Sequence, residues 1–268
     1  MLSDYHVHTD YSPHAHSSVE AQLAAAAAAG LDEICFTDHM ENGPLELNFH
    51  ADFTARNAHL LRVRDTAPVP FKIGAEFGMT APDGNRATEE EIRSFPYDFV
   101  LLSLHELDQK DIYFEDLTDT YGVQGLIRYY LRTYYEGLIT VDPDCFSSAA
   151  HLDYMEKCAP AVHYRDGIMR YEDAPDEFDE IFRYVIEHGK CIEINTSVYK
   201  KLPKGVRSGA DWLRRYRELG GEYVTIGSDA HATEYVGYEM ILARELALSA
   251  GIKYQATYEA MKPVMHML

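Results

Sequence analysis

This 268-residue chain has no long apolar run, few cysteines and few basic side chains. No stretch approaches the roughly 20 consecutive apolar residues that a membrane-spanning helix needs, so we expect no membrane partner. The segment Met1–Asp4 leads directly into the first predicted strand and leaves no room for a secretory signal. Together these absences predict a cytoplasmic protein.

The cysteine spacing excludes a zinc finger and a CxxC redox motif. At least two of the cysteines lie inside predicted strands, which favours buried thiols of a cytosolic protein. The four are Cys35, Cys145, Cys158 and Cys191.

Acidic side chains outnumber basic ones, with 44 Asp and Glu against 24 Lys and Arg and a net charge of −20. Binding to nucleic acid needs clustered basic side chains, so this balance argues against a nucleic-acid partner. It also repels a phosphorylated substrate unless bound divalent cations reverse the charge locally. An acidic surface also keeps a protein soluble, and it is too common to indicate a particular function.

Seven short apolar runs each end on a side chain that can bind a metal ion. If the runs are parallel strands, their carboxyl ends lie together at one mouth of a barrel or one edge of a sheet. Histidines and carboxylates from most of the chain then converge, which predicts a polynuclear metal hydrolase. The runs are residues 4–9, 34–39, 73–76, 101–105, 149–153, 193–195 and 224–231.

Helical patterns alternate with these runs. Ser17 as N-cap and Glu20 three positions later form a capping box, which predicts a helix that Gly30 ends. Further helices are predicted near 53–64, 89–94, 123–135, 177–188, 210–219 and 238–250, with another near the C-terminus.

Strand–helix alternation predicts an α/β fold with a mostly parallel sheet. Ligands at the end of every strand favour a closed or nearly closed barrel over a doubly wound sheet. No linker divides the chain, so we expect residues 1–268 to form a single domain. The segments 108–120 and 203–209 follow strand ends, where loops that cover a substrate would lie.

Individual motifs carry less weight than their repetition. His6 and His8 are two apart on a strand and therefore point to the same side, but such pairs also occur by chance. Asp38 could fix the ring of His39 or cap the next helix. Glu76 is an acid in an apolar strand, and it needs either a buried arginine or bound cations.

The later motifs follow the same pattern. His105 and His151, taken singly, read as ordinary polar strand ends. Asp229 and His231 form the sharpest motif, because they lie two apart directly after an apolar strand and Gly227. Coincidences at the same position of successive strands favour a metal site strongly.

This series of motifs resembles the PHP (polymerase and histidinol phosphatase) family over essentially the whole chain. The resemblance implies a distorted (β/α)7 TIM-like barrel with two or three metal ions at the carboxyl ends of its strands. The implied ligands are His6, His8, His39, Glu76, His105, His151, Asp229 and His231.

Within the family, the segments 193–197 and 227–231 resemble the monofunctional histidinol-phosphate phosphatases. This likeness implies hydrolysis of L-histidinol phosphate, a small phosphate ester, to L-histidinol and phosphate in histidine biosynthesis. One position departs from the common pattern, because His14 stands near the place where many members carry an aspartate. His14 either replaces that ligand or binds substrate.

Imidazole and carboxylate donors without thiolates suit zinc, manganese or iron. Two neighbouring cations would lower the pKa of a shared water and bind phosphoryl oxygens, so that hydroxide attacks phosphorus. Glu76, Asp229 and His231 are the expected catalytic residues. Arg165, Lys201 and Arg207 lie in loops after strands and are candidates for binding the phosphate, although basic loops are often merely solvated.

Other activities remain open at this point. A relative that cleaves another phosphomonoester or a phosphodiester would share the site. An amidohydrolase would carry a strand-end lysine where this chain has Glu76 and His105. A non-catalytic binding module would have lost ligands. The sequence leaves the oligomeric state undetermined.

Overall fold

A computed structural model describes residues 1–43, 50–157, 168–200, 202 and 208–268. Each of the seven predicted runs contains a strand, and neighbouring strands pair in parallel, which confirms the predicted α/β class. Their order in the sheet is β1 (Ser3–Val7), β2 (Glu33–Phe36), β4 (Phe71–Gly78), β5 (Phe99–Ser103), β8 (Ser148–Ala149), β9 (Cys191–Asn195) and β10 (Tyr223–Gly227).

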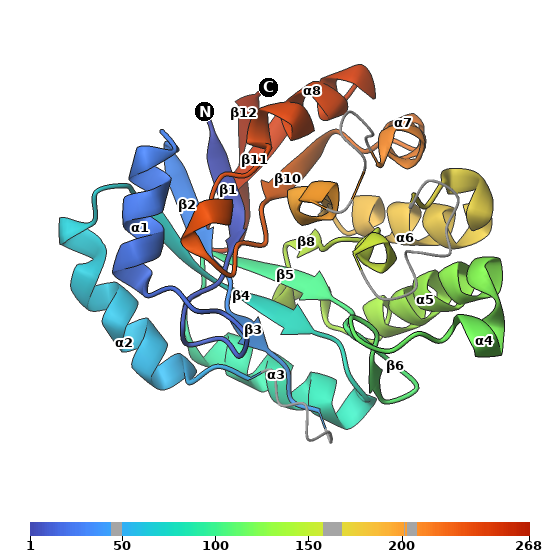
Figure 1. The fold of residues 1–268 in the computed structure, drawn as a ribbon, viewed down its shortest axis with the longest axis horizontal. Helices are drawn as coiled ribbons and strands as arrows, with labels where there is room; N and C mark the ends of the chain where they lie inside the picture. The colour runs from blue at the N-terminus through green and yellow to red at the C-terminus, as the bar shows by residue number, and fades with distance from the viewer. Residues whose placement is uncertain (44–49, 158–167, 201, 203–207) are drawn as a thin grey trace.

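The first strand also meets the chain just after β10. An isolated parallel bridge joins Val7 to Ala230. The backbone N–H of His8 donates to the Ala230 carbonyl at 3.0 Å, and the Ala230 N–H donates to the carbonyl of His6 at 3.3 Å. The sheet therefore curls far enough for the chain after β10 to meet β1 through this isolated bridge, and the strands form a distorted, barrel-like curve (Figure 1).

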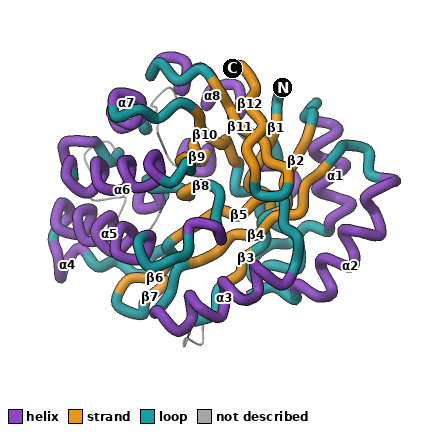
Figure 2. The backbone as a smooth tube through the Cα atoms, turned by 180° about the vertical axis from the view of Figure 1, so that it is seen from behind, coloured by secondary structure: helices purple, strands orange, loops and turns teal. Residues whose placement is uncertain are grey.

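Helices surround the strands on the outside (Figures 1 and 2). The α-helices are α1 (Val19–Ala28), α2 (Phe53–Val63), α3 (Pro82–Ser94), α4 (Thr118–Tyr121), α5 (Val123–Leu138), α6 (Pro175–Glu187), α7 (Ala210–Glu218) and α8 (Met240–Ser249). Short 3-10 helices are η1 (Arg64–Thr66), η2 (Pro143–Cys145), η3 (Tyr154–Glu156), η6 (Tyr171–Asp173), η7 (Thr196–Lys200) and η8 (Thr233–Tyr235).

The predicted capping box at the start of α1 is wrong by one residue. Ser18, not Ser17, is the N-cap, and its side-chain oxygen accepts a hydrogen bond from the N–H of Ala21 at 3.2 Å. Glu20 therefore occupies the second helical position. Gly30 follows the helix with φ +70°, the left-handed conformation that suits glycine at this end.

Two further boundaries differ from the sequence prediction. Helix α3 begins at Pro82, well before residue 89, because proline suits the first turn, where its missing N–H is not needed. The predicted C-terminal helix is wrong. Strands β11 (Tyr254–Glu259) and β12 (Lys262–Met267) form an antiparallel hairpin instead, and β11 pairs in parallel with β10 and so extends the sheet.

Smaller strands complete the mouth of the barrel. Strand β3 (His39–Met40) pairs in parallel with β4, and β6 (Glu106–Leu107) pairs with β7 (Lys110–Asp111) in a separate hairpin. Cys35, Cys145 and Cys191 are buried free thiols, and Cys158 lies outside the described residues. Among the described helices, none is both long and apolar enough to cross a membrane.

Candidate metal centre and substrate pocket

The structure brings the eight predicted ligands together at the carboxyl ends of the strands. Register explains part of this convergence, since His39 on β3 stands directly opposite Glu76 on β4. Seven of the eight side chains are buried, and His231 is about one-third exposed. The ligands are His6, His8, His39, Glu76, His105, His151, Asp229 and His231.

Glu76 lies at the centre of the cluster and is 1% exposed. Its Oε2 atom lies 2.8 Å from His39 Nδ1, 3.4 Å from His6 Nε2 and 3.5 Å from His8 Nε2. Its Oε1 atom lies 2.9 Å from His151 Nε2. Within the described residues no arginine or lysine pairs with it, so the imidazoles alone surround this buried carboxylate.

Asp229 forms the other acidic centre. Its Oδ1 atom lies 3.3 Å from both His8 Nε2 and His231 Nδ1, and 3.7 Å from His6 Nε2. Its other oxygen accepts a hydrogen bond from Lys157. Asp229 has φ +52°, a left-handed conformation that aspartate tolerates better than most residues and that turns its carboxylate into the cluster.

Several ligand atoms have no hydrogen-bond partner although they are buried. Among the described residues these include His6 Nε2, His8 Nε2 and Glu76 Oε2, and the carboxylate oxygen lies 3.4 and 3.5 Å from the two nitrogens. Unsatisfied polar atoms in a protein interior are costly, and a shared cation removes that cost. The three converging lone pairs therefore fit a metal ion.

More than one ion fits the donor set. Among the residues that the structure describes, five groups of three donors each have ligand atoms within 4.8 Å of one another. The donors are nitrogen and oxygen only, a set that suits zinc, manganese or iron. The groups are His8/His39/His231, His6/His151/Asp229, His6/His8/Glu76, His39/Glu41/His105 and Glu76/His105/His151.

Neighbouring side chains fix the imidazole tautomers. His6 Nδ1 lies 2.7 Å from Glu193 Oε1, and a carboxylate can only accept, so the proton stands on Nδ1 and leaves Nε2 free for a metal. His8 Nδ1 lies 3.3 Å from Ser12 Oγ. The Ser12 hydroxyl donates its hydrogen bond to Asp38 Oδ1 at 2.8 Å, so its oxygen accepts from His8 Nδ1. Both rings of the first motif are therefore turned to offer Nε2.

Asp38 does not cap the next helix. It accepts hydrogen bonds from the Thr9 N–H at 2.6 Å and from Arg56 Nε at 2.5 Å. The N-cap of α2 is Asp52 instead. Asp38 therefore affects His8 only indirectly, because it accepts a hydrogen bond from Ser12, which in turn contacts the His8 ring.

Glu41 joins the site and was not predicted. Its Oε1 atom lies 2.5 Å from His105 Nδ1 and 3.6 Å from His39 Nδ1. It stands two residues after His39, the same spacing that pairs His6 with His8, so the strand period could have revealed it. Glu193, on β9, likewise lies two residues before the noted Asn195.

Charge within the cluster shifts the pKa values in opposite directions. Burial opposes a charge on His6, but the carboxylates of Glu193, Asp229 and Glu76 raise its pKa well above the usual value. Burial and the neighbouring His231 and His39 lower the pKa of His8 well below it. The protein without metal therefore holds some imidazoles protonated and others neutral.

The remaining shifts follow the same physics. Burial opposes a charge on His105, but Glu41 and Glu76 raise its pKa to about 10. Burial also opposes the charge of Glu76, yet the histidines around it hold its pKa well below the usual range. The central carboxylate is thus ionised at neutral pH and available to a cation.

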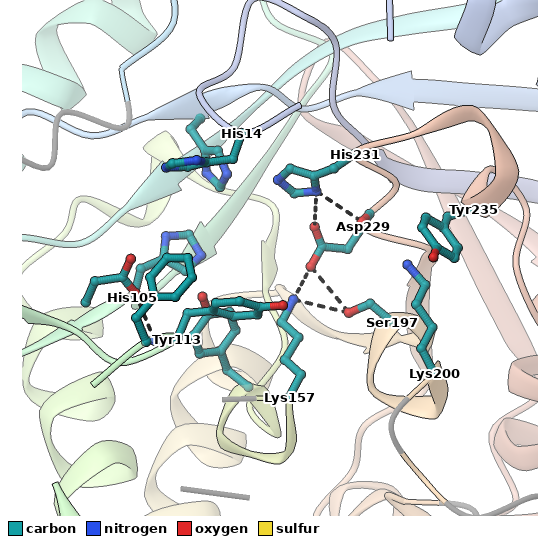
Figure 3. Close-up of a pocket in the computed structure, with 13 residues that line it drawn as sticks. His14, His105, Tyr113, Lys157, Ser197, Lys200, Asp229, His231 and Tyr235 are labelled. Carbon is teal, nitrogen blue, oxygen red and sulfur yellow. Dashed lines mark hydrogen bonds and ion pairs between the residues drawn. The ribbon is translucent and has the colours of Figure 1, made fainter. Parts of the chain in front are cut away.

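A cavity of about 410 Å³ opens beside the cluster. Figure 3 shows Asp229 and His231 at its centre, with Lys157 and Ser197 linked to Asp229 by hydrogen bonds. Lys200 lies on one side, where its Nζ atom sits 3.6 Å from the centre of the Tyr235 ring. The cavity thus joins the ligand cluster to cationic side chains.

Of the four predicted substrate-binding residues, only His14 lies in the described part of the chain. His14 lines the cavity and belongs to none of the donor groups found among the described residues. Arg165, Lys201 and Arg207 lie outside the described residues. Lys157 was missed, because its approach to Asp229 depends on the turn η3 and no spacing signals it.

An α/β barrel that gathers imidazoles and carboxylates at the carboxyl ends of its strands defines a metal-dependent hydrolase class. A family model described as PHP domain matches residues 4–197, which include six of the eight predicted ligands. The chain belongs to the PHP domain family.

Individual relatives agree with this assignment. A histidinol-phosphatase from Lactococcus lactis is 29% identical over 265 residues, 97% of this chain and 95% of the relative. A probable histidinol-phosphatase from Clostridium acetobutylicum is 27% identical over 256 residues, 94% of this chain and 95% of that one. The crystal structure of the L. lactis histidinol phosphate phosphatase, complexed with zinc, L-histidinol and phosphate, matches with a TM-score of 0.81. It is 25% identical, and the match covers 98% of each chain.

Proposed function

We propose that this protein is a metal-dependent phosphatase that hydrolyses L-histidinol phosphate to L-histidinol and phosphate, a reaction of histidine biosynthesis. The observation that carries the proposal is the buried ring of imidazoles around Glu76 and Asp229, which opens directly into a cavity that contains lysines. The likeness to histidinol-phosphatases over nearly the whole chain supports the choice of substrate.

Two or three divalent ions would be held by the eight clustered ligands, and zinc is the first candidate because the related L. lactis structure contains it. Bound divalent ions lower the pKa of water and neutralise charge on phosphoryl oxygens. Asp229 and His231 face the cavity, while Glu76 lies behind them among the imidazoles. We assign the catalytic roles to these three residues.

Lysines beside Asp229 would bind the phosphoryl group. Lys157 Nζ donates to Ser197 Oγ at 3.1 Å as well as to Asp229, so this cation is held rigidly at the edge of the cluster. Lys200 is packed against the rings of Tyr235 and Tyr238, with its ammonium group in the cavity wall. Two fixed cations beside the metal ligands suit a dianionic phosphate ester.

The other substrate-binding residues, the partners and the location remain predictions from the sequence. Arg165, Lys201 and Arg207 remain candidates for phosphate binding, and His14 remains a candidate for substrate contact. We expect a small-molecule ester as the only substrate class, without a nucleic-acid partner, and a cytoplasmic location.

Phosphate release from L-histidinol phosphate tests the function, beside a panel of other phosphomonoesters and one phosphodiester. The protein is assayed as isolated, after chelation, and after addition of zinc, manganese or iron. We expect a strong preference for L-histidinol phosphate that metal restores. Metal-dependent activity on other esters alone would retain the phosphatase and reject the substrate. No hydrolysis of any ester with metal bound would reject the function.

A further inference from the structure

The two sides of the cavity carry opposite charge. Lys157 and Lys200 lie near Asp229, whereas Asp111 lines the wall that also contains Tyr113 and Phe114. Figure 3 shows Tyr113 and Lys200 on opposite sides of the cavity, with Asp229 between them. A molecule that fills this cavity therefore meets cations at one end and a carboxylate with aromatic rings at the other.

Asp111 is a buried acid, 5% exposed, at the end of the short hairpin of β6 and β7. Its Oδ1 atom accepts a hydrogen bond from the Tyr113 N–H at 2.8 Å. Within the described part of the chain, no lysine, arginine or histidine forms an ion pair with it. Burial raises the pKa of Asp111, and the nearby His105 and His14 offset that rise only in part, so a cationic group on the ligand in direct contact would improve this site.

The hairpin holds Asp111 in place relative to the metal ligands. Its turn residues Asp108 and Gln109 both have positive φ, and the Asp108 carboxylate accepts hydrogen bonds from the hydroxyls of Tyr121 and Tyr129 at 2.5 and 2.7 Å. Directly after Asp111, the Ile112 N–H donates to the carbonyl of the ligand His105 at 3.2 Å. The carboxylate thus has a fixed position beside the metal cluster.

Aromatic rings adjoin this carboxylate. Tyr113 and Phe114 contact each other edge to face with ring centres 4.9 Å apart, and both line the cavity. Phe114 is 66% exposed, so its ring is accessible to a molecule in the cavity. The wall as a whole suits a cationic amine attached to a flat ring.

We infer that Asp111 binds the ammonium group of the substrate, so that the enzyme selects phosphomonoesters whose alcohol carries an amine near the ester. This inference rests on the proposed function, because the phosphate must lie at the lysine end for the amine to reach Asp111. Tyr113 and Phe114 then pack against the substrate ring. Selection arises because the uncharged analogue gives the buried carboxylate no cationic partner.

Asp111→Asn is the decisive variant. Asparagine keeps the carbonyl oxygen that accepts from the Tyr113 N–H, so the turn survives while the charge is lost. Steady-state kinetics are measured on L-histidinol phosphate and on the same ester without its amino group. Glu115→Gln is the matched control, because Glu115 is exposed in the same loop and does not line the cavity.

We expect Asp111→Asn to lower kcat/KM for the amine-bearing ester about 10- to 100-fold, the range of a hydrogen bond to a charged group. Activity on the deaminated ester and the bound metal should stay within about twofold of the wild type, an allowance well below the tenfold that 1.4 kcal/mol produces. Asp111→Glu should restore part of the selectivity, and Glu115→Gln should leave it unchanged.

Equal losses on the two esters, or an unchanged ratio, would overturn the inference while the phosphatase assignment stands. The same holds for a wild-type enzyme that does not prefer the amine-bearing ester. Absence of any hydrolysis by the metal-loaded wild type would instead overturn the proposed function, and the two failures are therefore distinguishable.

Discussion

The metal ligands stand on strands or directly after them, whereas the residues that face them across the cavity stand in connecting segments. His6, His39 and Glu76 belong to β1, β3 and β4. Lys157 and Lys200 follow or end short 3-10 helices, and Asp111 ends a two-residue strand. Strand pairing fixes the first region, and loop conformation fixes the second.

The two regions also differ in how their side chains are supported. In the ligand cluster, a second layer made by Glu193, Ser12 and Glu41 holds the imidazoles by their Nδ1 atoms. In the cavity wall, cations and aromatic rings support one another, as Lys200 does with Tyr235. The comparison implies that changes in the first region abolish chemistry, while changes in the second alter substrate affinity and choice.

The largest effect is expected for loss of a ligand. Asp229→Asn keeps a side chain that tolerates positive φ but removes the negative charge among His6, His8 and His231. We expect kcat to fall at least about 1,000-fold, with reduced metal content, as for His8→Ala. Kinetics and elemental analysis measure both. Asp65→Asn, on the exposed surface, is the control, and full activity of Asp229→Asn would remove Asp229 from the ligand set.

Stability should depend on pH in opposite ways with and without metal. In the metal-free protein, the pKa of His6 lies well above 6.5 and that of His105 is about 10, so the folded state holds two protons that the unfolded chain releases above pH 6.5. Groups with raised pKa stabilise the fold fully below the unfolded value, and this stabilisation is lost as pH rises. Each group changes the free energy of unfolding by about 1.4 kcal/mol per pH unit.

From pH 6.5 to 8 the chelated protein should therefore lose unfolding free energy, at most about 2 kcal/mol for each ring that stays protonated in the fold. The window stops at 8, since Lys200, whose pKa burial lowers to about 8, begins to act in the opposite direction there. The metal-loaded protein should gain stability over the same range, because ions replace these protons and bind more tightly as pH rises. Urea unfolding of both forms measures this, and parallel trends would contradict a metal site at these histidines.

A smaller effect is expected from the carboxylate behind His6. Glu193→Gln preserves the shape of the side chain but removes the charge that holds the Nδ1 proton. We expect metal affinity to fall about 10- to 100-fold, as is typical when such a partner is lost, with kcat at saturating metal less affected. Competition with a chelator measures the affinity. Glu187→Gln, at the exposed end of α6, should change nothing; an unchanged affinity for Glu193→Gln would show that ring orientation needs no carboxylate.

The smallest effect is expected in the cavity wall. Lys200→Met keeps a flexible side chain of similar length and removes the ammonium group that lies over the Tyr235 ring. We expect KM to rise about tenfold for amine-bearing and deaminated esters alike, because one hydrogen bond to a charged group is lost. Metal content should be unchanged, and exposed Lys253→Met serves as control. A rise confined to one of the two esters would place Lys200 at the alcohol end rather than at the phosphate.

The same division explains what could be predicted from the sequence. The clustering of candidate ligands such as Glu76 and His105 could be predicted because burial and strand period determine where a strand ends and which way its side chains point. Lys157 was missed because its contact with Asp229 depends on the path of the chain after β8, which no local pattern specifies. Asp111 was included only within a loop expected to cover substrate.

Errors in the fold have equally local causes. Ser17 and Ser18 offer the same hydroxyl, and the extended backbone of Ser18, with ψ 162°, decides which one caps α1. The C-terminal hairpin was predicted as helix because its short strands lack a clear alternation of apolar and polar residues. Its pairing with β10, a tertiary contact, determines the structure.

The bridge between Val7 and Ala230 has a consequence for how the protein is made. His6 and His8 are synthesised more than two hundred residues before Asp229 and His231. A chain that stops before Asp229 therefore lacks part of the donor set. The contacts that complete it join residues far apart in the sequence, and such contacts form slowly. Full occupancy of the proposed metal site would require both β1 and the segment after β10, so a chain truncated before Asp229 should not bind the full set of ions.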